Sequence, residues 1–164
     1  MTDASETIYT FSLVLASTKS INYLRNEKIS LMFTFYTPQT ANKALAEVKH
    51  LFENIVMQKN HVVGLQEQLQ AIIDSGNPFE GFIKKKQELN SAVTNLYKAI
   101  EHLEATGVVI KSVDEGLLDF PSRRFNEEVW LCWKVGENEI KFWHGKEEGF
   151  MGRKPLESTG VIEP

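Results

Sequence analysis

The side chains best suited to chemistry lie close together in the last third of the chain. His144 is followed within four residues by Glu147 and Glu148, and Asp119 lies on a separate predicted strand. Imidazole and carboxylate groups together can bind a divalent metal or transfer protons. The histidine and cysteine spacings typical of zinc sites do not occur. Two interpretations stay open: a metal site formed by His144, Asp119 and Glu148, or, as we favour, an imidazole that bonds a backbone carbonyl and fixes the following loop.

A second candidate is Arg153, which stands between a glycine and a nearby proline. A guanidinium group can hold a carboxylate or phosphate through two parallel hydrogen bonds. We predict a polar site for a small anionic ligand, formed by Arg153, Lys111, Asp119 and His144. The favoured alternative is an ion pair that ties the C-terminal segment to the sheet. Its acidic partner would be Asp114, Asp119 or Glu148.

The single cysteine offers little support for nucleophilic catalysis. Cys132 lies within a predicted strand, where a small buried hydrophobic side chain is more typical than a nucleophile. One cysteine excludes an intrachain disulfide, which indicates a reducing, cytoplasmic location. Nucleotide-binding glycine loops, a serine nucleophile elbow and the His-Glu-x-x-His motif are absent from the sequence. The sequence therefore assigns no reaction and no cofactor, and a divalent metal is the one option left open.

Composition restricts the class of partner. The chain has 164 residues, of which 42% are hydrophobic and 24% charged, as in an ordinary globular domain. Its net charge of −4 argues against binding to nucleic acid or to an anionic membrane surface. No apolar run approaches the roughly 20 residues that a spanning helix requires. We therefore expect neither a nucleic-acid nor a membrane partner.

Two long helices are predicted ahead of the candidate site. Thr37 and Pro38 are favoured as helix N-cap and first residue, and a breaker at 75–78 separates helices at about 38–74 and about 79–105. Their apolar residues recur in steps of three and four, as in a coiled coil. These residues are Leu45, Val48, Phe52, Ile55, Val62, Leu69 and Ile73 in the first helix, and Phe82, Leu89, Val93, Leu96, Ile100 and Leu103 in the second. The short connection makes the helices antiparallel, and we expect the sheet or a second copy of the chain to cover them.

The hydrophobic period changes at residue 108. Short strands are predicted at 108–111 and 117–120, and a hairpin at 127–134 and 139–144 with a type II′ turn at Gly136–Glu137. The predicted pairs are Lys134 with Glu139, Trp133 with Ile140, Leu131 with Phe142 and Trp130 with Trp143. This register places His144 on the face of Leu131, and a one-residue slip would exchange the partners. The predicted fold is α+β: a long antiparallel helical hairpin, then a small antiparallel β-meander over about 108–144 and an ordered loop at 145–156.

Four motifs are spread over residues 35–156. They are Phe35-x-Thr37-x-x-x-Ala41-Asn42-x-x-Leu45, Gly107-x-x-x-Lys111-x-x-Asp114-x-Gly116-Leu117-x-Asp119-Phe120-Pro121, Leu131-Cys132-Trp133-x-x-Gly136-Glu137-x-x-Ile140-x-x-Trp143-His144 and Gly149-Phe150-x-Gly152-Arg153-x-Pro155-Leu156. In these residues the chain resembles the prokaryotic family known as domain of unknown function 2203. The resemblance implies a fold grouping and no activity.

The ends of the chain are predicted to lie outside this single domain of residues 35–156. Residues 1–34 match none of the motifs, and residues 1–31 show no sustained period. We interpret them as a misassigned or loosely held extension, with Met32 as the natural start; the alternative is a genuine added helix or strand. Residues 157–164 are predicted to be a solvated tail.

The sequence favours a non-enzymatic interaction or assembly module that dimerises through its helical hairpin. Its further partner would be an unknown protein or a small anionic ligand. The alternative is a metal-dependent hydrolase that uses His144 with nearby carboxylates.

Overall fold

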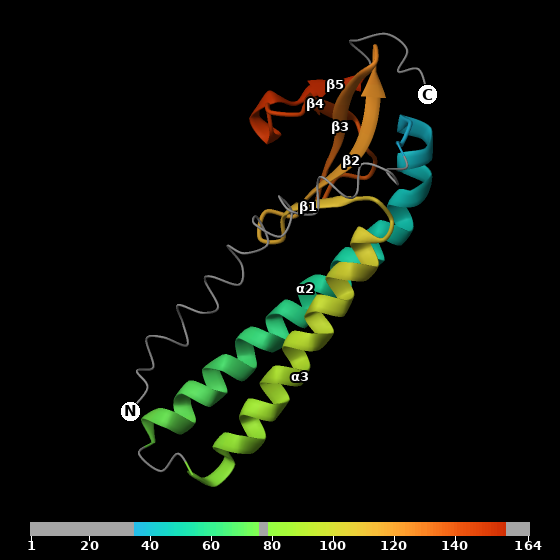
Figure 1. Ribbon diagram of the computed structural model, residues 1–164. Coiled ribbons are helices and arrows are strands. Elements are labelled where there is room, and N and C mark those ends of the chain that lie inside the picture. The colour runs from blue at the N-terminus through green and yellow to red at the C-terminus, as the bar shows by residue number, and fades with distance from the viewer. Residues whose placement is uncertain (1–34, 76–78, 157–164) are drawn as a thin grey trace. The chain divides into compact units, whose positions relative to one another are not determined.

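The structure, a computed structural model, describes residues 35–75 and 79–156. Helix α2 spans Pro38–Asp74 and helix α3 spans Phe79–Glu104, and the two lie antiparallel, side by side (Figure 1). These bounds agree with the predicted helices to within one residue. The expectations for residues 1–34, for the break at 76–78 and for the tail at 157–164 lie outside the described residues.

The start of α2 follows from local interactions of threonine and proline. The Thr37 hydroxyl oxygen accepts the Thr40 backbone N–H at 3.1 Å, and the Thr40 hydroxyl oxygen accepts the Thr37 N–H at 2.8 Å. Pro38 occupies the first turn, where a backbone N–H would have no helical partner. These reciprocal bonds define the N-terminal end of α2 through local contacts alone.

The two helices differ in how deeply their predicted stripes are buried. In α2 the stripe residues are buried, except Ile73, which is 37% exposed. In α3 the stripe residue Leu103 is buried with Ala92 and Ala99, whereas the other stripe residues are only half-buried. The α2 prediction is thus confirmed, and the α3 stripe is buried only at its end.

The domain has one main core and a helical extension of it. The main core joins the first half of α2 and the end of α3 to the sheet, with Phe52 and Leu103 among its members. Farther along, Val62, Leu65 and Leu69 are buried outside that core, where α2 packs on α3. The far half of the hairpin therefore rests on helix–helix packing.

The sheet is an antiparallel β-meander, as predicted. Its strands follow in sequential order: β1 (Val109–Ser112), β2 (Leu117–Arg124), β3 (Glu127–Lys134), β4 (Phe142–Gly145) and β5 (Lys154–Pro155). Phe125 and Asn126 connect β2 to β3, both with positive φ, as a tight two-residue hairpin turn requires. The C-terminal loop contains a 3₁₀ turn, η1 (Phe150–Gly152), besides β5.

The predicted register between β3 and β4 was wrong by one residue. Leu131 lies opposite Trp143, Cys132 opposite Phe142, and Trp130 opposite His144. Opposite residues share a face, so Trp143 belongs to the core face with Leu131, and His144 lies on the other face with Trp130 and Cys132.

The connection between β3 and β4 is longer than the predicted two-residue turn: the chain turns one residue earlier, but irregular backbone at 138–141 then separates the turn from β4 and moves the β4 partners the other way. The Glu137 N–H donates to the Lys134 carbonyl at 3.0 Å, so Val135 and Gly136 are the central turn residues, with Gly136 at φ 96°. Lys134 is therefore not paired with Glu139; its N–H donates to the Glu137 carboxylate at 2.9 Å.

Ile140 pairs with a helix side chain instead of with Trp133. The Ile140 N–H donates to Asn42 Oδ1 at 2.7 Å, and Asn42 Nδ2 donates to the Ile140 carbonyl at 3.3 Å. Asn42 of α2 thus supplies both bonds that a neighbouring strand would have supplied, and β4 begins only at Phe142.

Among the described residues, neither helix is long and apolar enough to cross a membrane.

Candidate functional site

Three chemically active side chains converge on the sheet face opposite the core. Asp119 of β2 lies opposite Cys132 of β3, and His144 of β4 lies opposite Trp130, two residues from Cys132. One potential ligand atom from each of Asp119, Cys132 and His144 lies within 4.8 Å of the others. Each of these residues is at most 2% exposed. We call this set the Asp–Cys–His cluster.

The hydrogen bonds of His144 determine its protonation. Nδ1 lies 2.8 Å from the Gly145 carbonyl, which can only accept, so Nδ1 carries a hydrogen. Nε2 faces the Asp119 carboxylate, 3.3 Å from Oδ1 and 3.2 Å from Oδ2. Burial lowers the pKa of the imidazole, but the bonds to Asp119 and to the Gly145 carbonyl and the Asp119 charge outweigh it and raise the pKa. Both nitrogens face acceptors, an arrangement that favours the protonated imidazole over the neutral one.

Cys132 is a thiol in this setting and not a nucleophile. Burial, the neighbouring Asp119 charge and a hydrogen bond to Asp119 raise the pKa of the thiol to about 12. A thiolate is the reactive form of cysteine, so unassisted nucleophilic chemistry at neutral pH is disfavoured.

Lys111 lies at the edge of the cluster. Its Nζ is 3.7 Å from Asp119 Oδ2 and 4.7 Å from the centre of the Trp130 ring. The Lys111 side chain is 41% exposed, so its ammonium group meets solvent while Asp119 does not. The structure thus brings together Lys111, Asp119 and His144 of the predicted anion site.

Arg153, the fourth residue of that predicted site, is engaged elsewhere on the same face. Its guanidinium group lies 4.1 Å from the Phe142 ring centre and 4.7 Å from that of Phe150. It forms an ion pair with Glu137, and its side chain is only 12% exposed. This arrangement ties the C-terminal segment to the β3–β4 connection.

Glu148, the third residue of the predicted metal site, lies outside the cluster. Its Oε2 accepts the Gly145 N–H at 2.8 Å, and Oε1 lies 2.7 Å from Lys154 Nζ. The bond from Lys154 is the largest cause that lowers the pKa of this carboxyl, and the bond from Gly145 adds to it. A side chain at Gly152 would clash with Glu148, since a Cβ there would lie 2.5 Å from the Glu148 Cβ. Glu148 therefore closes the turn after β4.

Residues 34–156 match the family described as uncharacterized conserved protein, DUF2203. The chain belongs to this family. No curated protein and no solved structure matched the chain. The match confirms the family grouping that the four motifs indicated and assigns no activity to it.

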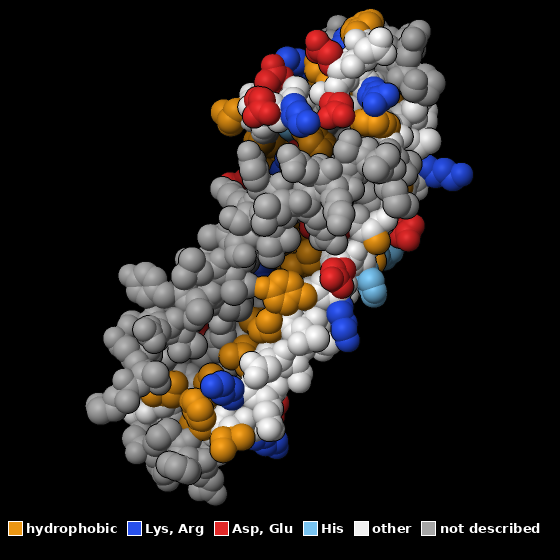
Figure 2. Space-filling view, viewed as in Figure 1, with side chains coloured by type: hydrophobic (Ala, Val, Ile, Leu, Met, Phe, Trp, Pro, Cys, Tyr) orange, Lys and Arg blue, Asp and Glu red, His pale blue; other side chains and the backbone are white. Residues whose placement is uncertain are grey.

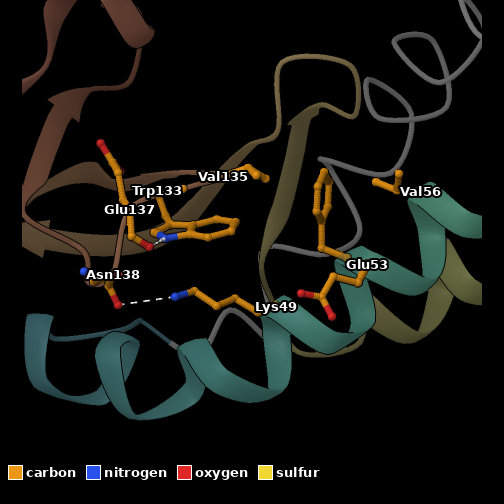
Figure 3. Close-up of a pocket in the computed structure, with 9 residues that line it drawn as sticks. Lys49, Glu53, Val56, Trp133, Val135, Glu137 and Asn138 are labelled. Atoms are coloured by element: carbon orange, nitrogen blue, oxygen red, sulfur yellow. Dashed lines mark hydrogen bonds between the residues drawn. The ribbon is translucent and has the colours of Figure 1, made fainter.

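A separate groove of about 370 Å³ lies on the helix side of this DUF2203 domain (Figure 3). It is lined by apolar groups of α2, of β3 and of the β3–β4 connection, among them Phe52, Val56 and Trp133. Lys49 crosses from α2 and donates to the Asn138 carbonyl at 3.3 Å, and the Trp133 indole N–H donates to the Glu137 carbonyl at 2.9 Å. The Lys49 bond holds the connection against α2, and the Trp133 bond holds it against β3.

The residue of the DUF2203 cluster that sequence reasoning missed is Cys132. Its position in the middle of a strand indicated a buried hydrophobic side chain, and it is indeed 1% exposed. The missing signal was the β3–β4 register, because only the observed register places His144 on the face of Cys132.

Proposed function

We propose that this protein is a non-enzymatic interaction and assembly module that forms a homodimer through its helical hairpin. The observation that carries the proposal is the face of α3 formed by Leu89, Val93, Leu96 and Ile100, which we call the α3 apolar face. These residues recur in steps of four, three and four, so they form one row along the helix. All four are half-buried, whereas Ala92 and Ala99 are buried.

A second copy of the chain suits this face because its hydrophobic row follows a coiled-coil repeat. Two-helix hairpins with such a repeat bury it most fully as a four-helix bundle. Figure 2 shows hydrophobic side chains along the length of the hairpin, with charged groups beside them. A two-fold axis would make the interface self-complementary, with α3 packed antiparallel on its partner.

Charges along α3 favour that antiparallel arrangement. Lys84, Lys85 and Lys86 lie in its first turns, and Glu101 lies in its last turn. Antiparallel packing brings the lysines at the start of each α3 beside Glu101 of the other copy. Exposed charge pairs of this kind contribute to orientation more than to affinity.

The test substitutes two residues of the α3 apolar face with polar residues of similar size. Leu89→Gln with Val93→Thr is chosen because Leu96 and Ile100 also pack against the main core, where a substitution would disturb folding. If each substituted side chain contributes about 1 kcal/mol, the dimer loses about 4 kcal/mol over its two copies, roughly a thousand-fold in Kd.

The matched control is Ile83→Gln, which removes a 64% exposed apolar side chain of the same helix away from this row. We expect the control to remain a dimer and the double variant to become monomeric with unchanged helix content by circular dichroism. A wild-type chain that stays monomeric at all concentrations would contradict the proposal.

The alternative, a metal-dependent hydrolase that uses His144 with Asp119 and Glu148, has less support. Glu148 is bonded to Gly145 and Lys154, away from Asp119. A hydrolytic metal also needs access for its substrate, whereas Asp119 and His144 are 1% and 2% exposed. We further propose a cytoplasmic location, because Cys132 is the only cysteine and is a free, buried thiol.

A further inference from the structure

The orientation of His144 is that of a metal ligand. Histidine ligands usually donate one ring N–H to a carbonyl or carboxylate, and this bond directs the other nitrogen at the metal. His144 Nδ1 donates to the Gly145 carbonyl at 2.8 Å. Nε2 is thereby aimed at Asp119, on the strand beyond Cys132.

The separation of His144 from Asp119 suits two ligands of one ion. Nε2 lies 3.3 Å and 3.2 Å from the two carboxylate oxygens, longer than the roughly 2.7–2.9 Å of a strong charge-assisted hydrogen bond. Two ligand atoms about 2.0–2.1 Å from a tetrahedral zinc ion are about 3.4 Å apart. A cation between them would therefore need little movement of either side chain.

Asp119 Oδ2 takes part in ion pairs with His144 and Lys111 but has no hydrogen bond among the described residues, although Asp119 is 1% exposed. Buried polar atoms are normally satisfied, and one that is not often marks the place of an ion or water. Lys111 Nζ, 3.7 Å away, compensates the carboxylate charge only from its solvent-exposed edge.

We propose that Asp119, Cys132 and His144 bind one divalent cation of the zinc class. Imidazole, thiolate and carboxylate are all zinc ligands, and thiolate selects against magnesium and calcium. The thiolate and the carboxylate together balance the two charges of the ion. Binding releases the Cys132 thiol proton and the Nε2 proton, because both ligands bind in their deprotonated forms.

The ion would be structural. Its three ligands come from β2, β3 and β4, the middle strands of the sheet, and all three are buried. The ion would link neighbouring strands, and a water molecule would occupy the fourth tetrahedral position, because the cluster supplies three protein ligands; burial of all three keeps a substrate from that position. Lys111 lies close enough to repel a cation, but its ammonium group is free to turn toward solvent. The site shares no residue with the α3 apolar face, so a failure of the dimer proposal would not affect the metal proposal.

The test uses the full chain, stripped with a chelator and titrated first with Co²⁺ and then with Zn²⁺. We expect one ion per chain by elemental analysis, a near-ultraviolet thiolate-to-cobalt absorption band, and displacement of cobalt by zinc. Cys132→Ala should abolish the band, and His144→Gln should weaken binding at least ten-fold, as loss of a ligand requires.

Two matched variants separate this site from others on the chain. Glu148→Gln keeps an oxygen for the Gly145 N–H and should retain the ion and the band. Loss of the ion in this variant would instead favour a site formed by His144, Asp119 and Glu148. His61→Gln removes an exposed helix histidine and should change nothing. If the Cys132 variant fails to fold, the alkylation rate of the wild-type Cys132 thiol replaces it as the test. Bound Zn²⁺ should slow that alkylation, and Mg²⁺ should not. A wild-type chain that binds no Co²⁺, or binds it without the thiolate band, would overturn the proposal.

Discussion

The buried pair of Asp119 and His144 should dominate the stability of the metal-free sheet. Both side chains are 2% exposed, and Nε2 lies 3.2 Å from the nearer oxygen. Removal of one partner of a buried ion pair leaves the other charge uncompensated and costs about 3–5 kcal/mol. Because 3.2 Å is long for such a pair, we expect Asp119→Asn and His144→Gln each to lose about 3 kcal/mol of unfolding free energy.

The double variant provides the sharper result. With both substitutions the cluster contains no charged pair, so the combined loss should be smaller than the sum of the single losses by about 2 kcal/mol. Lys111 remains beside Asp119 in His144→Gln, which makes Asp119→Asn the cleaner of the two single variants.

The assay is urea unfolding in the presence of chelator, followed by tryptophan fluorescence. Trp130, Trp133 and Trp143 lie in β3 and β4, so the signal reports on the sheet. The control cycle uses Lys154 and Glu148, an ion pair with side chains 44% and 43% exposed, and should show no measurable coupling. Strictly additive losses for Asp119 and His144, or a loss below about 1 kcal/mol for Asp119→Asn, would refute the assigned ion pair.

Substitutions at Asn42, Gly116 and Gly64 test individual contacts of the fold. Asn42→Ala removes both bonds to the Ile140 backbone and should lower the unfolding free energy, measured in urea, by about 2 kcal/mol. Asn42→Asp keeps the oxygen that accepts the Ile140 N–H and should lower it by less. Equal losses in the two variants would refute the role of that oxygen. Gly116→Ala should cost more than about 1 kcal/mol, because Gly116 has φ 65° and a Cβ would lie 2.4 Å from Val135 Cγ2. Gly64→Ala, in α2 with nothing within 4 Å of its Cβ, should instead raise the melting temperature, and a fall would contradict this comparison.

The helices could be predicted because their signals are local. Thr37, Pro38 and the three- and four-residue steps of α2 depend on neighbours within one or two turns, and α2 has the predicted bounds. The inward face of α3 could not be predicted in the same way. Its large apolar residues marked a stripe, but Ala92 and Ala99 are buried where most of that stripe is only half-buried.

The β3–β4 register depends on contacts between residues distant in sequence. Gly136 suggested a two-residue turn, yet Asn42, 98 residues before Ile140, takes the place of a strand partner. Sequence patterning alone allowed both registers, because both faces of the hairpin carry aromatic residues.

The candidate site was predicted only in part, because its geometry depends on the β3–β4 register. Lys111 of β1 and Asp119 of β2 lie on neighbouring strands of the predicted meander, whereas Asp119 and His144 of β4 meet across β3 only because the observed register places both on the face of Cys132. Glu148 was chosen for its nearness in sequence to His144, but the turn after β4 folds it back to the Gly145 N–H. Cys132 entered the cluster only through the observed register.

The mass of the full chain in solution tests the central claim, self-association through the α3 apolar face, most directly. Sedimentation velocity over a wide concentration range should give a species of twice the 18.7 kDa chain mass. The Leu89→Gln, Val93→Thr variant should return it to a single chain mass at concentrations where Ile83→Gln stays dimeric. A wild-type mass of 18.7 kDa at every concentration, or a dimer that the double variant leaves intact, would contradict the account.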